Sequence, residues 1–422
     1  MTSLEHRHER LPVTRPPHTA LALILTLSVA CSGGGDVPTT DQGISTWTTE
    51  AAYQLAEAAD AGVFFETPVV RADPERDRVV VVDAGSAQVS VWTPEGVLRA
   101  VEGRVGEGLG AFPTVAGLFI EEDGTLSAVD GGGSRFAYFA ANGEHLGTQL
   151  GPGTSLEYEG LSVRLAPPRD GVYLGTAEVT PHLEVGATYG PFAGQPPMLR
   201  EPVLRVRRSD TGQWLEPEPL LWLDISNRVM AAEYPDGGRS FGGQPFGDYD
   251  QVRFEPGTAI VMRTKGGPGS VELIEVDGAG DTVWHRHLQL EPRQLTREMV
   301  DEVLDARIDV FAPLRIGRIT REQLRDIYDE ALYQPEYLPA AQGRPIPTSS
   351  GEIWFRTHEV VDTLRVHYAV RRGDMDEPPR RVLLPEWLRV HDATATHVWG
   401  IRRDPMDMQH VVGRRLVELE EE

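Results

Sequence analysis

Strand-like patterns of apolar residues dominate the chain from about residue 65 onward. The four valines Val79–Val82 run without interruption up to Asp83, as is typical of a strand buried on both faces. Val89 and Val91 then alternate with polar residues, which indicates a second strand with one buried face. Gly96 follows a proline and a glutamate, a tight-turn signal. The pattern therefore predicts strand, turn, strand and turn.

The same series of features returns 47 residues later. Five pairs share this offset without a gap: Asp83 and Asp130, Gly85 and Gly132, Val89 and Phe136, Val91 and Tyr138, and Gly96 and Gly143. Strand-rich repeats of about 40–50 residues are typical of the blades of a β-propeller. The sequence thus predicts an all-β fold made of repeated small sheets.

Weaker copies extend the pattern to six units, with the poorest match in residues 151–250. The third to sixth units are read at 170–176, 203–206 and 212–215; 259–262 and 270–284; 351–356 and 362–370; and 396–401 and 409–417. A propeller must close on itself, because open sheet edges invite aggregation. The stretch from Trp47 to Phe65 either completes the terminal blade or, given its alanines, forms a short helix.

Residues 292–338 break the strand pattern and predict a small helical insertion between the fourth and fifth blades. Thr296 precedes a helical apolar stripe, and Thr320 with Gln323 forms a capping-box pair before a second stripe. The insertion is read either as a cap packed on the rim of the propeller or as a lid or docking element.

The linker ahead of the second repeat resembles that of NHL-type six-bladed propellers. Gly106–Pro113 matches their glycine-rich, Phe- and Pro-containing linker, and the turn at 120–124 precedes a strand that ends at Asp130. The chain as a whole resembles bacterial six-bladed propeller lipoproteins of uncharacterised function. The resemblance implies a structural role for the repeat residues Asp83, Gly85, Asp130 and Gly132, in which the aspartates bind turn backbone. A catalytic or metal-binding role for the two aspartates is the less favoured alternative.

The first thirty residues predict an export signal rather than part of the fold. Arginines precede a twelve-residue apolar run, Thr19–Ala30, which is too short to span a bilayer. Cys31, the only cysteine, follows directly and resembles the acylated cysteine of bacterial lipoproteins. We therefore expect a signal peptide at 1–30, lipidation of Cys31, a flexible tether at 31–45, and a propeller at 46–422. An ordinary cleaved signal peptide with an incidental cysteine is the alternative.

Composition and charge narrow the function classes. The formal net charge is −24, which disfavours nucleic acid as a partner. A single cysteine excludes an intrachain disulfide and a zinc site built from several cysteines. The predicted address is the bacterial cell envelope, with the propeller facing the periplasm or the exterior and acting as a monomer.

Candidate chemistry in the sequence is sparse. His285 and His287 share a strand face and offer two metal ligands, with no third at a recognisable spacing. The only lysine, Lys265, lies in a predicted turn, and the glycines at 106–110 lack the following helix of a dinucleotide loop. No catalytic or cofactor-binding residue is therefore assigned. Binding of a divalent cation in the central channel remains an alternative.

Three functions remain. The favoured one is a non-catalytic binding or protein-interaction module, whose ligand would be a protein, a peptide or a glycan. The alternative is a metal-dependent hydrolase or lyase of the lactonase-like, six-bladed type, an inference from fold alone. The third is a structural component of an envelope complex.

Overall fold

The computed structural model describes residues 44–55, 65–83, 85–86, 88–102, 115–130, 135–152, 155–186, 196–315, 319–374 and 376–419. All of them belong to one compact unit, residues 38–422. The predicted signal segment and Cys31 lie outside the described residues, as do Gly132 and the linker at 106–113 that carries most of the NHL resemblance.

Two four-stranded antiparallel sheets form the first two blades. Their strands are β2 (Pro68–Asp73), β3 (Arg78–Asp83), β4 (Gln88–Trp92), β5 (Leu98–Glu102), β6 (Val115–Ile120), β7 (Leu126–Asp130), β8 (Arg135–Phe139) and β9 (His145–Leu150). Val79–Val82 are fully buried, as the uninterrupted valine run predicts. Gly96 and Gly143 adopt φ values of 86° and 95°, the left-handed turn geometry that glycine tolerates without a Cβ clash.

Nine strands form the third and fourth blades. Their strands are β10 (Glu157–Tyr158), β11 (Leu161–Leu165), β12 (Val172–Ala177), β13 (Arg200–Arg207), β14 (Glu218–Asp224), β17 (Gln251–Glu255), β18 (Thr258–Arg263), β19 (Ser270–Asp277) and β20 (Thr282–Gln289). A short helix, α1 (Pro181–Glu184), follows β12. Residues 212–215, read as part of the third unit, lie in the connection between β13 and β14, where Trp214 forms an isolated bridge with Arg208 and packs edge-on against Tyr173. The last strand of this blade is β14.

The fifth and sixth blades are joined in one eight-stranded sheet. Their strands are β21 (Gln342–Pro347), β22 (Glu352–Val361), β23 (Leu364–Arg371), β24 (Arg380–Pro385), β25 (Arg389–Ala393), β26 (His397–Arg403) and β27 (Gln409–Glu418). The N-terminal strand β1 (Thr46–Gln54) pairs antiparallel with β27 and supplies the outermost strand of the sixth blade. It touches β24 through only two parallel residue pairs. The stretch that begins at Trp47 therefore completes the terminal blade.

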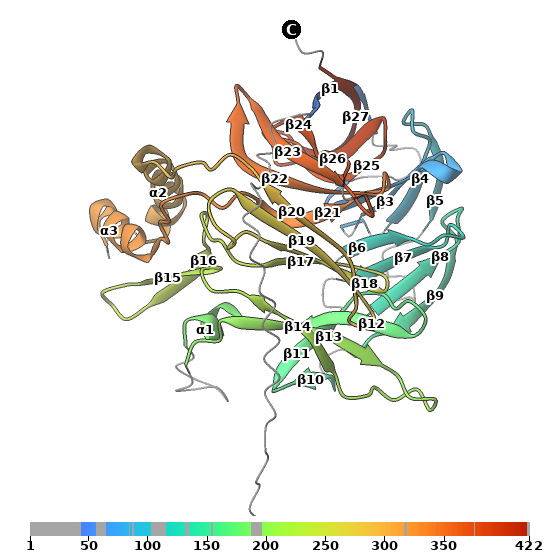
Figure 1. Cartoon of the computed structure of the whole chain (residues 1–422), viewed down its shortest axis with the longest axis horizontal. Coiled ribbons are helices and arrows are strands. Elements are labelled where there is room, and N and C mark those ends of the chain that lie inside the picture. The colour runs from blue at the N-terminus through green and yellow to red at the C-terminus, as the bar shows by residue number, and fades with distance from the viewer. Residues whose placement is uncertain are drawn as a thin grey trace, which may run out of the picture. The chain divides into compact units, whose positions relative to one another are not determined.

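The first strands of neighbouring blades contact one another. β2 contacts β6 on one side and β25 on the other, while β17 contacts β21 and β21 contacts β25. The sheets follow one another in chain order, from blue to red in Figure 1. Within the described residues they make six blades, and the predicted six-bladed propeller is confirmed.

The helical insertion packs with a hairpin that the sequence analysis did not predict. α2 (Arg297–Phe311) and α3 (Arg321–Ala331) lie beside β15 (Val229–Glu233) and β16 (Arg239–Gly243), as Figure 1 shows. The four elements share an apolar core that includes Met230, Leu304 and Tyr328. The predicted capping box is present, because Thr320 Oγ1 accepts from the Gln323 amide at 3.1 Å and Gln323 Oε1 accepts from the Thr320 amide at 3.0 Å.

Short 3-10 turns occupy Pro74–Arg76 and Ala312–Arg315. Among the described helices, none has the length and apolar character needed to cross a membrane.

Candidate functional site

Arginine recurs on the innermost strands of the propeller. We take β2, β6, β11, β17, β21 and β25 as the inner strands of the six blades. All of them except β6 carry an arginine, namely Arg71, Arg164, Arg253, Arg344 and Arg389. Because the inner strands of the blades face the centre of the ring, residues far apart in sequence come near one another there. Arg71, Arg344 and Arg389 act electrostatically on Arg253, while Arg164 pairs with Glu178 at 2.7 Å. The centre of this acidic protein is therefore rich in positive charge.

Arg71 ties its own blade to four others. Its Nε donates to the Leu118 carbonyl at 3.0 Å, its Nη1 donates to the Pro347 carbonyl at 2.7 Å, and its Nη2 donates to Glu255 Oε1 at 2.8 Å. Asp392 Oδ1 lies 3.9 Å from Nη1. Only 6% of Arg71 is exposed. The guanidinium is therefore a structural hub of the ring.

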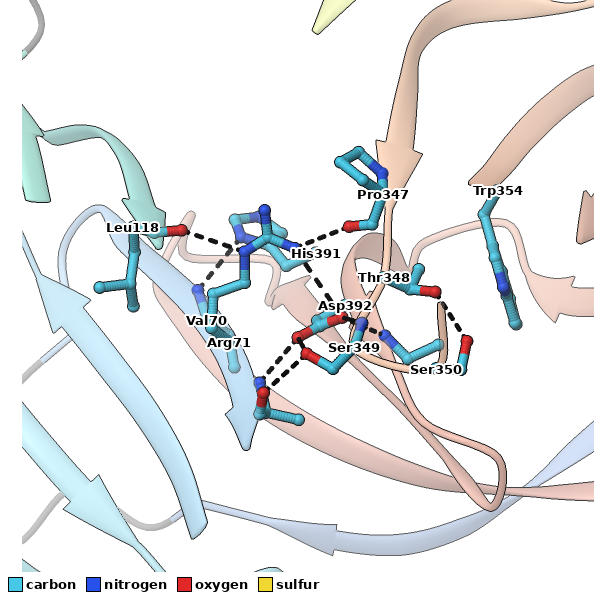
Figure 2. Close-up of polar contacts among 12 residues, drawn as sticks. Val70, Arg71, Leu118, Pro347, Thr348, Ser349, Ser350, Trp354, His391 and Asp392 are labelled. Carbon is cyan, nitrogen blue, oxygen red and sulfur yellow. Dashed lines mark hydrogen bonds and ion pairs between the residues drawn. The ribbon is translucent and has the colours of Figure 1, made fainter. Parts of the chain in front are cut away.

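The carboxylate of Asp392 extends this hub, as Figure 2 shows. Asp392 Oδ2 accepts from the Ala72 amide and from Ser349 Oγ, both at 2.7 Å, and Oδ1 accepts from the Ser349 amide at 2.8 Å. Ser349 Oγ also contacts the Ala72 carbonyl at 2.7 Å. These bonds join β2 to β25 and to the turn after β21. The Ser349 hydroxyl therefore has a structural role, because its hydrogen bonds hold these segments together.

Electrostatics at the centre differ between neighbouring groups. Burial works to lower the pKa of Arg71, but the Glu255 and Asp392 carboxylates outweigh it and raise that pKa. Burial, together with the like charges of Arg71, Arg344 and Arg389, lowers the pKa of Arg253 to about 10 against the opposing effect of the Glu255 carboxylate. Two carboxylates, Glu255 and Asp392, thus compensate the charge of Arg71, whereas Arg253 is influenced by three arginines and by one carboxylate, Glu255.

His391, on β25, responds to the same positive field. Burial and the charges of Arg389, Arg253 and Arg71 lower its pKa to about 3. Its Nδ1 accepts weakly from the Val70 amide at 3.4 Å (Figure 2). The imidazole is therefore neutral at ordinary pH.

A cavity of about 330 Å³ opens beside these arginines. Phe119, Val252 and Phe254 contribute apolar walls, and Arg253 and Arg344 contribute charge. This combination of apolar walls with a few polar groups is the usual composition of a ligand site.

The carboxylates that line the cavity are already engaged. Glu201 pairs with Arg228 at 2.7 Å, Asp250 accepts from Arg263 Nε at 3.2 Å, and Asp130 Oδ1 accepts from the Arg135 amide at 3.2 Å. Within the described part of the chain, Arg253 and Arg344 have neither an ion pair nor a side-chain hydrogen bond. The cavity therefore contains positive charge that the protein does not neutralise.

A second, larger cavity of about 990 Å³ lies near the helical insertion. Several of its charged and polar groups already have partners: Arg381 pairs with Glu359 at 2.6 Å, and His358 bonds at 2.9 Å to Gln342, which lies outside the lining. It also borders Ile44, the first described residue. Its chemistry is less distinctive than that of the cavity at Arg253.

The two repeat aspartates occupy equivalent places at the ends of β3 and β7. Asp83 accepts from the Glu66 amide at 3.0 Å, from the Thr67 amide at 2.6 Å and from Ser86 Oγ at 2.7 Å. A Cβ on Gly85 would lie 2.3 Å from Glu66, so the close approach requires glycine. Asp83 thus binds turn backbone, while Asp130 binds a backbone amide at the edge of the cavity.

The histidine pair and the lysine lie away from this cavity. His285 contacts Glu272 and His287 contacts Ser270, each at 3.0 Å across the β19–β20 ladder. Lys265 pairs with Asp224 at 2.9 Å. No group of three or more His, Cys, Asp or Glu side chains arranged for a metal ion occurs among the described residues.

Sequence reasoning missed the inner arginines. The available signal was the presence of a guanidinium inside apolar strand segments, such as Val70-Arg71-Ala72 and Val252-Arg253-Phe254. A charge flanked in this way is costly unless it is paired or meets a ligand.

Comparisons with known proteins give only distant structural likeness. No family model matches the chain, and no curated protein matches its sequence. A Bacteroides fragilis protein provisionally described as exported has 9% identity over 88% of this chain and 96% of its own, with a TM-score of 0.42. A DUF4221 family member from Bacteroides vulgatus has 8% identity over 89% and 99%, with a TM-score of 0.44.

A streptogramin B lyase has 9% identity over 88% of this chain and 98% of its own, with a TM-score of 0.37. Values this low assign no function, and the NHL resemblance stays a prediction.

Proposed function

We propose that this chain is an exported binding module, held at a bacterial membrane by a lipid on Cys31, that captures a ligand in the cavity beside Arg253 without transforming it. The observation that carries the proposal is the cavity itself. Strands of different blades converge on one space of about 330 Å³ that has apolar walls and unneutralised guanidinium groups. A rigid ring of sheets can hold such groups in place without a ligand, which lowers the entropic cost of binding.

The charge of the centre favours binding over metal-dependent hydrolysis. A catalytic cation needs several oxygen or nitrogen donors that converge on one point. Glu255 and Asp392 lie near the centre, but both are engaged with Arg71. The surrounding arginines would repel a cation, so these residues do not fit a resident metal ion.

Binding without turnover is directly testable. Small polar compounds of negative, zero and positive charge are mixed with the full chain, and saturation-transfer NMR detects those that bind. We expect at least one binder, recovered chemically unchanged after prolonged incubation. Burial raises the pKa of Asp250, a property that suits a general acid. A compound that is consumed by the chain but not by an Asp250→Asn variant would overturn the non-catalytic proposal.

The proposed membrane anchor at Cys31 requires a separate experiment. The full chain and a Cys31→Ser variant are expressed in a bacterial host, extracted with Triton X-114 and partitioned. We expect the unchanged chain in the detergent phase and the variant in the aqueous phase, because acyl chains supply about 0.8 kcal/mol for each buried CH₂ group. Equal partitioning of the two proteins would contradict the anchor while leaving the binding proposal intact.

A further inference from the structure

We infer that the cavity beside Arg253 and Arg344 is a site for a small organic anion, one that carries a carboxylate or a phosphate on an apolar or aromatic body. The inference rests on the proposed binding function and names the class of ligand that the site takes. It follows from the charges, the strand placement and the walls of the cavity.

The first argument is an imbalance of charge. Each carboxylate lining the cavity accepts a hydrogen bond from another part of the protein, as described above for Glu201, Asp250 and Asp130. Arg253 and Arg344 have no carboxylate partner within the described residues. Arg253 is half-buried, and an unpaired cation there is unfavourable by itself. Arg344 is exposed and adds to the same positive charge, which an anionic ligand would neutralise.

The second argument is placement. Arg253 is the third residue of β17, Arg344 is the third residue of β21, and these two inner strands contact each other. Their guanidinium groups carry planar forks of N–H donors that match carboxylate and phosphate oxygens. Two such forks on adjacent strands suit one oxyanion group.

The third argument is the remainder of the wall. Phe119, Val252 and Phe254 line the same space, with Tyr249 and Gln251 as further polar groups. An inorganic ion would leave these apolar surfaces exposed to water, whereas an organic body covers them. The volume of about 330 Å³ is at the small end of ligand sites. The site therefore fits a compact organic anion.

A purely structural role for these arginines makes a different prediction. Arg71 shows what a structural arginine looks like here, since all three of its nitrogens find acceptors at 2.7–3.0 Å. If Arg253 is kept for a ligand, replacing it removes repulsion from Arg71, Arg344 and Arg389 in the ligand-free protein. Arg253→Met should then raise the thermal midpoint while it weakens anion binding. A structural role predicts that the midpoint falls.

The test uses three probes of similar shape: benzoate, phenylphosphate and uncharged benzyl alcohol. Isothermal titration measures their binding to the full chain, to Arg253→Met, to Arg344→Met and to the control Arg415→Met. Arg415 lies on β27, is largely exposed and pairs with Glu50. We expect the anions to bind at least tenfold more tightly than benzyl alcohol. Each cavity variant should lose about tenfold to hundredfold in anion affinity, the usual effect of removing a charged hydrogen bond, and the control should not change.

Two results would overturn the inference: benzyl alcohol binding as tightly as the anions, or anion binding that survives in both cavity variants. Neutral ligands bound in the cavity would leave the proposed binding function standing and refute only the anionic class. Preference for phenylphosphate over benzoate would identify phosphate as the recognised group, and the reverse would identify carboxylate. A raised midpoint in Arg253→Met, together with lost anion binding, would support the inference against a structural role.

Discussion

Replacing Arg71 with methionine should destabilise the ring far more than replacing an exposed arginine. Methionine keeps much of the apolar stem but removes the charge, so Glu255 loses its ion-pair partner and the Leu118 and Pro347 carbonyls lose their donor. Breaking a buried pair by removing one partner costs about 3–5 kcal/mol. Because the Glu255 side chain keeps 21% of its exposure, the lower end of about 3 kcal/mol is expected.

Urea denaturation, followed by tryptophan fluorescence, measures this loss as a shift of the unfolding midpoint. Arg415→Met is the matched control, because that arginine pairs with Glu50 at 2.6 Å while both side chains are more than half exposed. Exposed pairs contribute about 0–1 kcal/mol. The double variant Arg71→Met with Glu255→Gln should recover part of the loss, since no unpaired carboxylate remains.

The reasoning would be refuted if Arg71→Met shifted the midpoint no further than Arg415→Met. It would also be refuted if the double variant were less stable than Arg71→Met alone. In either case the contacts of Arg71 would not hold the blades together.

Three further predictions concern other parts of the fold. A Cβ on Gly413 would lie 2.5 Å from the Tyr53 ring, so Gly413→Ala should lower the free energy of unfolding by about 1–3 kcal/mol. The control Gly243→Ala should have little effect, because its Cβ would meet nothing within 4 Å. Equal urea midpoints for the two variants would contradict this prediction. Burial lowers the pKa of His367 to about 4, below the ordinary value near 6.5, so the unfolded chain binds the proton first and stability should fall as the pH drops from about 6.5 to 4. The thermal midpoint of His367→Gln should decline less over that range, and parallel profiles would refute the assignment. Thr320→Ala removes the capping box of α3 and should lower the free energy of unfolding by about 0.5–2 kcal/mol. Amide hydrogen exchange should become faster in α3 but not in β3. Unchanged exchange in α3 would contradict this prediction.

The repeated blade could be predicted from sequence because its signals are local. The valine run that ends at Asp83 and the glycine at each turn depend on neighbouring residues, and they recur 47 positions later. The helical insertion was predictable for the same reason, since Thr320 and Gln323 satisfy each other's backbone amides over one helical turn.

The cavity could not be predicted in this way. Arg71 reaches Glu255, 184 residues along the chain, and the Pro347 carbonyl, 276 residues along. Those contacts exist only after the ring has formed, and no periodicity connects the positions. The 47-residue repeat does not reveal the inner arginines either, because the residue 47 positions after Arg71 is Leu118. The hairpin β15–β16 was missed because its apolar residues pack on the helices rather than on a blade.

The pairing of β1 with β27 closes the ring through strands that are far apart in sequence. Seven residue pairs join the two strands, and Glu50 on β1 contacts Arg415 on β27, 365 positions further along the chain. Without β1, β27 would have an unprotected hydrogen-bonding edge. Deleting either strand should therefore leave the circle open.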